Sequence, residues 1–505
     1  MGGLSQRPDE HRRVEDAAVA IVGYGPVGAT LAILLGQLGQ RVVVLERWPE
    51  PYPLPRAVHL DHEIARIFQA CGLADDLVAI TEPADIYEWR NGAGVPLLRI
   101  GRHGVSASGW PESLMFHQPA LEATLDGRAR SLPGIDVRRG VEVVDLLQDA
   151  DGVTLMAATG DEIRTRYVVG CDGANSTVRS LIGASIHDLG FFYDWLVVDV
   201  ILHEQRVFDP LNLQVCDPAR PTTLVSGGPG RRRWEFMRLP DEPLDGLDSD
   251  GRAWELLADW DVTPTNAELE RRAVYTFGAR VAEQWRSGRV LLAGDAAHQT
   301  PPFAGQGMCT GIRDAANLAW KLDRVLRAAS PDDLLDTYQQ ERLPSTRQLI
   351  DFAIELGKII CVPDPDEAAA RDAAMASGVG DDPSPAPPPP PIEAGVVAAG
   401  TPAAGELFLQ ARLEGALFDE VHGSGWRLVT VEARESALDE ETRHSFGDLG
   451  GSIVVVDTPE YRRWFEERRV AWALQRPDFH LYGTAVDAAG AAELITSLVG
   501  LLTTP

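Results

Sequence analysis

The alternation of apolar and polar residues in 289–322 predicts a buried strand, a loop and a long helix. The run 290–293 is entirely apolar, as expected for a strand at the centre of a sheet, and a Gly-Asp turn follows it. From Met308 to Leu322 apolar residues recur at helical spacing. A helix that begins near Gly307 directs its free N–H groups and the positive end of its dipole at the loop before it. The pattern therefore predicts a site for a ligand that carries negative charge.

A second pattern, near the N-terminus, is typical of dinucleotide binding. The apolar strand 17–22 leads into Gly-Tyr-Gly-Pro-Val-Gly, an apolar helix at 29–38 and a second apolar strand at 41–45 that ends at Glu46. In this context the glycines permit a tight turn, bring backbone close to a pyrophosphate and let the helix pack on the strand. Glu46 follows at close to the spacing of about 20 residues at which a carboxylate binds ribose hydroxyls.

The middle of the chain has the pattern of a mainly antiparallel sheet. Short apolar runs are separated by turn residues, and the predicted strands are 195–202, 214–216, 222–226 and 234–239, with a further β-like region at 86–114. We expect this sheet to roof a substrate pocket. The arginine cluster 231–233 is expected to be the solvated end of a hairpin. A second cofactor-contacting loop is predicted at the Asp-Gly turn within Cys-Asp-Gly-Ala-Asn-Ser-Thr-Val-Arg, 171–179.

The C-terminal part divides into a proline-rich stretch and a small α/β unit. The stretch 363–402 is rich in Ala, Asp and Pro, which indicates a semi-rigid linker or surface wrap rather than core. Beyond it, strands are predicted at 426–431, 453–456 and 471–474, and a helix at 488–501.

Composition excludes several classes of function. The 505 residues carry a formal net charge of -29, which argues against nucleic-acid binding and against docking on anionic membranes. The five cysteines show no CxxC or zinc spacing, so we expect no metal site, reduced thiols and a cytoplasmic location. Residues 1–16 are polar, without a signal core, and are expected to be a disordered leader. No run approaches the roughly 20 apolar residues of a membrane span.

Three motifs in order resemble the flavin-dependent aromatic hydroxylases, the class A FAD monooxygenases. They are Gly-Tyr-Gly-Pro-Val-Gly with Glu46, the 171–179 segment, and Gly-Asp-Ala-Ala-His-Gln-Thr-Pro-Pro-Phe-Ala-Gly-Gln-Gly-Met at 294–308. Local matches at 55–58, 116–119, 193–199, 216–221 and 232–236 are similar to the 3-(3-hydroxyphenyl)propionate hydroxylase-like branch.

The resemblance implies an α/β protein with a Rossmann-like FAD-binding domain, a mainly antiparallel β substrate-binding domain and a C-terminal thioredoxin-like α/β domain. The expected FAD-binding domain is discontinuous and comprises 17–85, 115–185 and 285–360. The substrate-binding domain comprises 86–114 and 186–284, the Pro-rich linker 361–403, and the thioredoxin-like domain 404–505. No cysteine lies beyond Cys361, so that domain lacks CxxC and is assigned a structural or dimer-contact role.

Carried over by position, the resemblance also implies functional residues. The FAD-binding residues are Gly23, Gly25, Gly28, Glu46, Arg47, Arg56, Gln118, Val143, Asp172, Asp295, Pro302, Gly305, Gly307 and Met308. The substrate-binding residues are Tyr193, Gln214, Trp234 and Pro302, and His59 is the candidate base for a phenolic hydroxyl.

The implied reaction consumes NADH or NADPH and O₂ and hydroxylates a phenolic or polycyclic aromatic substrate through a flavin hydroperoxide. A homodimer is also compatible with the resemblance. Two alternatives remain open at this point: a tailoring monooxygenase that inserts oxygen into a C–C bond of a polyketide-type substrate, and a flavin-binding scaffold without turnover. An intact 301–308 loop argues against the scaffold.

Overall fold

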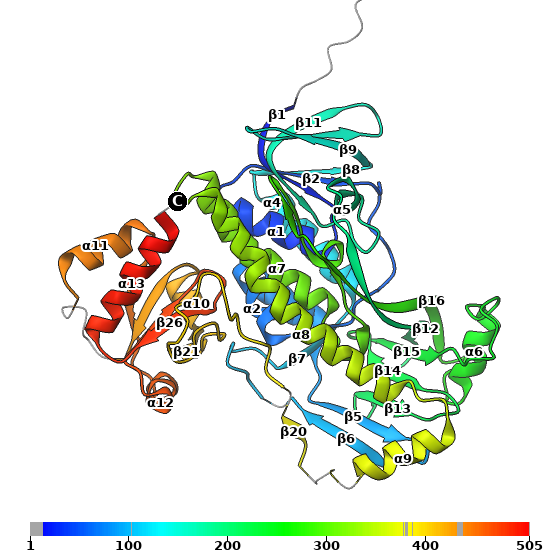
Figure 1. Ribbon diagram of the computed structural model, residues 1–505. Helices are drawn as coiled ribbons and strands as arrows, with labels where there is room; N and C mark the ends of the chain where they lie inside the picture. The colour runs from blue at the N-terminus through cyan, green and yellow to red at the C-terminus, as the bar shows by residue number, and fades with distance from the viewer. Residues whose placement is uncertain are drawn as a thin grey trace, which may run out of the picture.

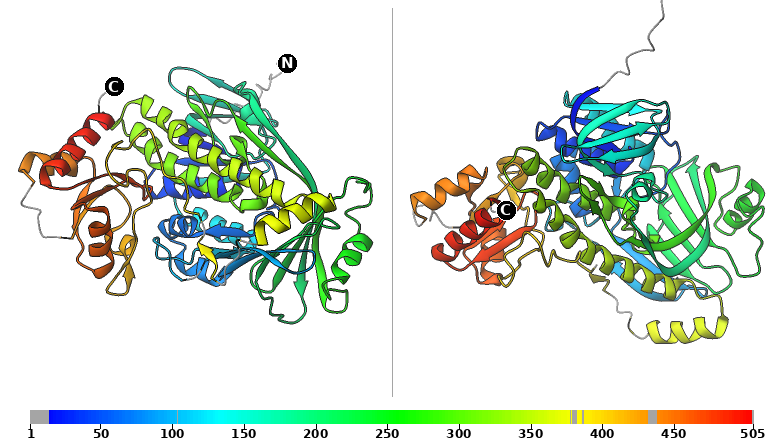
Figure 2. Two further views of the ribbon diagram at one scale, coloured as in Figure 1. Left: turned by 60° about the horizontal axis from the view of Figure 1, so that its bottom comes forward. Right: turned by 45° about the horizontal axis from the view of Figure 1, so that its top comes forward.

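The computed structural model describes residues 14–102, 104–376, 378, 382–385, 387–431 and 438–503, and it has three parts (Figure 1). The three parts are a parallel sheet with its helices, a large antiparallel sheet, and a small C-terminal α/β unit. The two long helices α7 (Gly307–Leu326) and α8 (Asp336–Ile360) lie between the C-terminal unit and the antiparallel sheet in all views (Figures 1 and 2). The mixed α/β fold expected from the sequence is confirmed.

The first sheet carries the predicted dinucleotide fingerprint. Its strands are β1 (Val14–Val22), β2 (Val42–Glu46), β8 (Ile135–Arg139), β11 (Glu162–Gly170), β17 (Arg286–Ser287) and β18 (Val290–Leu292), in the order β17-β18-β11-β1-β2-β8. All pairs except β17–β18 are parallel. β9 (Val143–Gln148) and β10 (Val153–Ala157) extend from β11 as an antiparallel flap. Parallel strands that are apolar throughout need helices on both faces, and α1 (Pro26–Gln37), α4 (Gln118–Ser131), α5 (Thr177–Leu181) and α7 accompany the sheet.

The second sheet has nine strands. They are β5 (Ile86–Asn91), β6 (Pro96–Gly101), β12 (Ile186–Leu202), β13 (Asn212–Cys216), β14 (Thr222–Ser226), β15 (Arg231–Met237), β16 (Ala267–Ala282), β19 (His298–Gln299) and β20 (Ser384–Pro385), in the order β19-β16-β12-β15-β14-β13-β5-β6-β20. One face packs on α6 (Asp250–Ala258) through a dedicated apolar cluster that includes Trp234, Val198 and Leu257. The opposite face is therefore free to form the wall of a cavity.

A third, smaller sheet has three strands. It consists of β3 (His59–Asp61), β7 (Ser113–Phe116) and β4 (Thr81–Pro83) in the order β3-β7-β4, with α2 (His62–Ala70) and α3 (Ala74–Ile80) beside it. Short 3-10 turns follow β18 and precede α7 and α8: η1 (Gly294–Ala296), η2 (Pro302–Ala304) and η3 (Asp332–Leu335).

The proline-rich stretch is more structured than its composition indicates. It contains α9 (Pro365–Ala376), and β20 adds to the edge strand β6. Ile392 and Val396 are buried, and the Val396 N–H donates to the Glu341 carboxylate at 2.8 Å. From its composition, the stretch 363–402 is expected to lie on the surface without contributing to the core. That expectation is wrong for its C-terminal half, because Ile392 and Val396 are buried and Val396 forms hydrogen bonds with Glu341 of α8 and Arg476 of the C-terminal unit.

The C-terminal unit is a four-stranded mixed sheet with helices. The strands β23 (Arg427–Thr430), β24 (Ser452–Val455), β25 (Trp472–Gln475) and β26 (Leu481–Ala485) are ordered β24-β23-β25-β26, and only β23–β24 is parallel. The remaining elements are β21 (Arg412–Leu413), β22 (Ala416–Leu417), α10 (Phe418–His422), α11 (Glu440–Asp448), α12 (Pro459–Arg468) and α13 (Ala488–Thr503).

Buried charges join this unit to the rest of the chain. Glu341 of α8 contacts Lys321 of α7 at 2.9 Å and Arg476 at 2.6 Å, and Arg476 also contacts Asp478 at 2.7 Å. All four side chains are essentially inaccessible to solvent. Such a cluster fixes the docking geometry, since a displaced partner would leave an uncompensated buried charge.

The predicted leader, 1–16, lies outside the described residues except for the start of β1, which begins at Val14 rather than at residue 17. All five cysteines are free, as expected. Among the described residues, no helix is long and apolar enough to cross a membrane.

Candidate active site

A cavity of about 1310 Å³ lies between the first sheet and the free face of the second. It is walled by the start of α1, the 293–308 loop, the second sheet, α8 and the prolines 387–391. Ten of the predicted site residues line it: Gly25, Arg56, His59, Gln118, Gln214, Asp295, Pro302, Gly305, Gly307 and Met308. Eight do not: Gly23, Gly28, Glu46, Arg47, Val143, Asp172, Tyr193 and Trp234.

The three fingerprint glycines have different surroundings. A Cβ on Gly23 would lie 2.4 Å from the Cys171 carbonyl oxygen, and one on Gly28 would lie 2.2 Å from the Gly23 carbonyl oxygen. These two positions are closed by close packing of backbone. A Cβ on Gly25 would meet nothing within 4 Å, because Gly25 faces the cavity at the uncapped start of α1. Open space beside free helix N–H groups suits a phosphate.

Glu46 holds the turn that carries these glycines. One carboxylate oxygen accepts the Tyr24 N–H at 2.9 Å and the other accepts the Trp48 N–H at 2.9 Å. Arg47 is exposed beside the Trp48 ring, and Val143 is a buried residue at the start of β9. Each carboxylate oxygen of Glu46 thus already accepts one backbone hydrogen bond. A ribose hydroxyl can bind Glu46 only through the lone pairs that remain.

The loop before α7 approaches the cavity with its backbone. Gly305 has a φ of 65°, a conformation that favours glycine, and a Cβ there would lie 2.9 Å from the His59 Nδ1. The helix starts at Gly307, and no side chain caps its first N–H groups. Free N–H groups, a helix dipole and a side-chain-free backbone form a cradle for a flat, electron-rich ligand edge.

His59 fixes this loop from the other side. Its Nδ1 is 3.1 Å from the Gly305 carbonyl oxygen, and its Nε2 is 3.0 Å from the Arg102 Nη1. Since a guanidinium only donates, the Nε2 must accept and the Nδ1 must carry the hydrogen. Burial and then the Arg102 charge lower the pKa of His59 to about 4. In this arrangement both ring nitrogens are occupied, so His59 is placed to hold the loop rather than to take a proton from substrate.

The turn at Gly294-Asp295 is supported from beneath by α7. Asp314 accepts the Gly294 N–H at 3.1 Å, contacts the His298 Nε2 at 2.6 Å and accepts the Arg342 Nε–H at 2.9 Å. These contacts keep the pKa of Asp314 below its usual range despite burial, through the His298 and Arg342 partners. Asp295 itself lines the cavity, and burial raises the pKa of its carboxyl group.

Two further predicted residues support loops that border the cavity. The Gln118 Oε1 accepts the Arg56 and Ala57 N–H groups at 3.1 and 2.6 Å, so it holds the backbone that carries Arg56. Asp172 accepts the Ser176 hydroxyl at 2.5 Å and the Val178 N–H at 3.0 Å, and thereby orders the start of α5.

The substrate side of the cavity has a polar patch on the sheet. The Gln214 Oε1 accepts hydrogen bonds from the Thr223 hydroxyl at 2.7 Å and from the Tyr87 hydroxyl at 3.4 Å. All three residues line the cavity. An aromatic group of Phe303, Phe277 and Trp195 packs ring to ring at 5.7 to 6.0 Å, and Phe303 and Phe277 also line the cavity.

The prediction that Trp234 contacts substrate is wrong in its geometry. Trp234 is paired with Leu224, and both project into the α6 cluster, whereas the adjacent Glu235 and Thr223 face the cavity. Successive side chains of a strand point to opposite faces. Tyr193 lies on β12 with its ring against Phe191 at 5.2 Å and does not line the cavity. The arginine cluster also differs from expectation, since Arg232 and Arg233 are buried.

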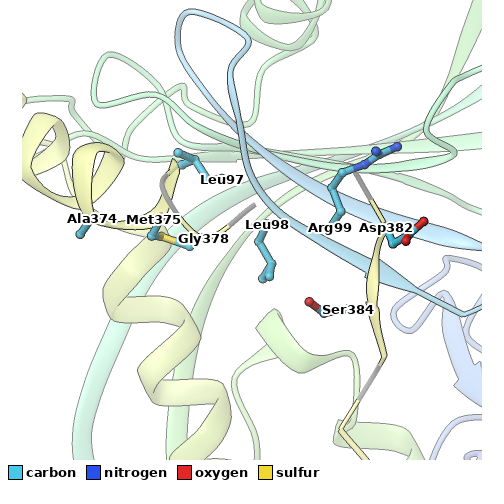
Figure 3. A pocket seen from close by; sticks show the side chains of 8 residues that line it. All are labelled: Leu97, Leu98, Arg99, Ala374, Met375, Gly378, Asp382 and Ser384. Carbon is cyan, nitrogen blue, oxygen red and sulfur yellow. The ribbon is translucent and has the colours of Figure 1, made fainter. Parts of the chain in front are cut away.

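A second cavity of about 310 Å³ lies between β6 and α9 (Figure 3). Leu97, Leu98, Met375 and Ser384 line it, and no residue lines both cavities. It holds none of the predicted site residues and is not part of the candidate active site.

The larger cavity fits FAD by the chemistry of its residues. Gly25 leaves room for a pyrophosphate at the start of α1, and the bare backbone of Gly305 and Gly307 leaves room for a flat ring at the start of α7. The chain belongs to the FAD-binding domain family, whose model matches residues 16–353. It is an FAD-dependent aromatic monooxygenase, as the three motifs indicated.

Individual relatives cover nearly the whole chain. It is 42% identical to a probable NADH-specific resorcinol 4-hydroxylase of Rhodococcus jostii (strain RHA1), over 99% of this chain and 97% of that protein. It is 34% identical to a 3-(3-hydroxy-phenyl)propionate/3-hydroxycinnamic acid hydroxylase of Mycobacterium sp. (strain JLS), over 98% and 94%. The fold matches that of the flavin-dependent monooxygenase PieE, solved with FAD and substrate, with a TM-score of 0.80, 22% identity and coverage of 97% of this chain and 100% of that one.

Sequence reasoning missed three residues that organise the site. Arg102 contacts His59, Asp314 holds the Gly294 turn, and Arg313 donates to Asp61 at 2.6 Å and to the Gln306 side chain in the loop at 2.9 Å. Arg313 and Asp314 are charged residues within a largely apolar helix, and the sequence alone could have marked them as having buried partners. No local pattern marks Arg102, because its contact with His59 forms only when the chain folds.

Proposed function

We propose that the chain hydroxylates a small phenol of the resorcinol type, with NADH as the electron donor. The observation that carries the proposal is the placement of the Tyr87, Gln214 and Thr223 patch in the same cavity as the Gly305–Gly307 backbone. Support for a resorcinol-type substrate and for NADH comes from the Rhodococcus relative, at 42% identity along the whole chain. Both named relatives are hydroxylases, which favours ring hydroxylation over insertion into a C–C bond.

In this proposal the FAD-binding residues have five roles. Gly23, Gly25 and Gly28 form the turn that binds the pyrophosphate: Gly25 leaves the open space for it, and Gly23 and Gly28 allow the close backbone packing behind that space. Glu46 and Arg47 meet the adenosine ribose, and Val143 meets the adenine with its backbone. Arg56, Gln118, Asp172 and Asp295 order the loops along the cofactor, and Pro302, Gly305, Gly307 and Met308 contact the ring.

When bound, FAD would supply reduction by NADH and transfer of one atom of O₂ to the aromatic ring. The α7 N-terminus stabilises negative charge on the ligand edge that contacts Gly307. Phe303 and Phe277, which pack on Trp195, would keep water from the apolar side of the cavity, a condition that oxygen transfer from bound FAD requires.

The polar patch orients the phenol. Tyr87 and Thr223 both donate to Gln214, so each keeps an oxygen lone pair with which to accept a hydrogen bond from a substrate hydroxyl. Burial raises the pKa of Tyr87, which therefore stays protonated at neutral pH. A meta-dihydroxybenzene has two hydroxyls, so one can bind this patch while the other stays available to another polar residue that lines the cavity.

The direct test is product formation under ¹⁸O₂. The purified holoenzyme, NADH and resorcinol should give a trihydroxybenzene that carries one ¹⁸O atom, measured by mass spectrometry. Gln214→Leu should raise KM for resorcinol by about tenfold, because the Tyr87 and Thr223 hydroxyls lose the acceptor that orients them toward the substrate, with FAD content unchanged. Gln284→Leu, an exposed position, is the matched control. Absence of any labelled phenol with resorcinol or its monohydroxy analogues contradicts the proposal.

A homodimer and a cytoplasmic location stay predictions. Sedimentation of the holoenzyme tests the first, and cell fractionation tests the second.

A further inference from the structure

Arg102 differs from the other arginines that line the cavity because it forms no ion pair with a described carboxylate. Five arginines line the cavity, and four of them have a carboxylate within 4.0 Å. The pairs are Arg56–Glu122 at 3.7 Å, Arg233–Asp199 at 2.7 Å, Arg271–Asp199 at 3.8 Å and Arg468–Glu406 at 3.1 Å. Within the described part of the chain, Arg102 has no carboxylate within that distance. Its charge is therefore not balanced by a direct protein partner.

The guanidinium of Arg102 also has unused donors. Its Nη1 donates to the His59 Nε2 at 3.0 Å and to the Ser113 Oγ at 3.1 Å. Its Nε is buried and without a hydrogen-bond partner, and no described residue accepts from its Nη2. Burial lowers the pKa of Arg102, as expected for a cation removed from water without an adjacent anion.

An unpaired cation with free donors is costly in a folded protein unless a ligand completes it. The fork of a guanidinium matches an anionic oxygen, and charge-assisted hydrogen bonds to it are the strong ones. Arg102 and His59 both line the cavity, the Arg102 Nη1 contacts the His59 Nε2, and the His59 Nδ1 contacts the Gly305 carbonyl. A single side chain, His59, therefore separates the Arg102 guanidinium from the loop assigned to the flavin.

We infer that Arg102 binds the ionised oxygen of the substrate and holds a phenol in its phenolate form. This inference rests on the proposed function and assigns the residue that selects the ionised substrate. A phenolate ring is more electron-rich than a phenol ring, so its carbons react more readily with an electrophilic oxygen. The phenolic proton leaves to solvent or to a neighbouring acceptor, while Arg102 stays protonated throughout and the charge of the pair is balanced. Arg102 acts by stabilising an anion and needs no proton transfer of its own.

The test is the pH dependence of resorcinol binding to the oxidised holoenzyme, followed by the change in the visible absorption of FAD. A free phenol has a pKa of about 10. If the phenol ionises at a lower pH when bound, the Kd should fall by about tenfold for each unit that the pH rises from the pKa of the bound phenol to that of the free phenol. Below the pKa of the bound phenol the Kd should be constant. The wild-type enzyme is expected to show this slope between about pH 7 and 9, and Arg102→Met is expected to lose it.

At pH 8, Arg102→Met should weaken resorcinol binding by about 10- to 100-fold, the loss expected for a hydrogen bond to a charged group. Binding of 1,3-dimethoxybenzene, which cannot ionise, should change less than twofold. Arg102→Lys should keep part of the slope. Ser113→Ala removes a partner of the same Nη1 without removing the charge, and it should keep the full slope. Arg90→Met, an arginine paired with Glu88 outside the cavity, is the control for loss of a positive charge.

Each outcome has a distinct meaning. An unchanged slope in an Arg102→Met protein that binds FAD normally overturns the assignment. A loss confined to 3-(3-hydroxyphenyl)propionate, with resorcinol unaffected, also overturns it and identifies a carboxylate as the anion. An altered FAD midpoint potential with an unchanged resorcinol slope overturns it in favour of the flavin. If no phenol perturbs the FAD spectrum even in the wild type, the proposed function itself fails, and that result is separate from the first three.

Discussion

Asp314 in the second turn of α7 accepts the backbone N–H of Gly294, twenty positions earlier in the chain, at 3.1 Å. The same carboxylate binds His298 and Arg342, and its side chain is inaccessible to solvent. The turn that presents Asp295 to the cavity is therefore tied to the helix whose N-terminus faces the same cavity. Any change at Asp314 acts on both walls of the cofactor site together.

Replacing Asp314 by Ala should destabilise the fold and weaken FAD binding. Removing the acid leaves Arg342 buried without its partner, which costs about 3–5 kcal/mol for comparable buried pairs. Thermal unfolding with and without excess FAD measures both effects. Asp351→Ala breaks the exposed pair with Arg347 on α8 and should cost less than about 1 kcal/mol. Equal stability of the two variants would contradict the role of Asp314.

Gly305→Ala should damage the cofactor site more than the fold. The new Cβ would lie 2.9 Å from the His59 Nδ1, at a backbone φ of 65° that alanine rarely adopts. We expect FAD affinity to fall by at least tenfold, because either His59 or the loop must move. Titration of the apoprotein with FAD measures this. Gly251→Ala on α6, where a Cβ meets nothing within 4 Å, should bind FAD as the wild type does.

The buried state of His59 predicts a specific loss of stability in acid. Its pKa is about 4 in the folded chain and about 6.5 when unfolded. Between these values the unfolded state binds more protons, so stability is complete above about pH 6.5 and declines as the pH falls towards 4. The loss is on the order of 3 kcal/mol at most.

His59→Gln removes this titration. The melting temperature of the variant should therefore fall less steeply than that of the wild type between pH 6.5 and 4.5. Parallel curves would show that His59 is not neutral and buried in solution.

Glu341→Gln should loosen the C-terminal unit. The carboxylate balances both Lys321 and Arg476, so its loss leaves two buried cations with only Asp478 as a partner. We expect a destabilisation of about 3–5 kcal/mol and faster proteolysis in the 387–405 segment. Glu355→Gln breaks an exposed pair with Lys358 and is the matched control. Proteolysis at the same rate in both variants would contradict the docking role of this cluster.

The sequence predicts best where structure depends on local patterns. The strand and helix around Gly23–Gly28 are present, although each begins three residues earlier than predicted, and the helix at Gly307 begins as predicted, because neighbouring residues determine these elements. The cavity-lining positions of Gly25, Gly305 and Asp295 could be predicted for the same reason, since each belongs to a contiguous motif.

The sequence is a poorer guide where a shift of one residue in strand register decides which face of the sheet a side chain occupies. Gln214 is paired with Thr223, and Thr223 with Glu235, so these three share the cavity face. Trp234 is one position away and therefore lies on the other face. Arg102 and Asp314 depend on contacts across 43 and 20 positions, which no local pattern specifies. Register and long-range pairing are properties of the folded sheet, not of any single segment.

The central claim is that a phenol in this cavity is processed by FAD held at the Gly305–Gly307 backbone. Anaerobic stopped-flow reduction of the bound FAD by NADH tests it most directly, with and without resorcinol. We predict that saturating resorcinol accelerates reduction by at least tenfold, and that admission of O₂ to the reduced complex yields hydroxylated product. Reduction at the same rate with and without resorcinol and every related phenol, with no product after O₂, would contradict the account.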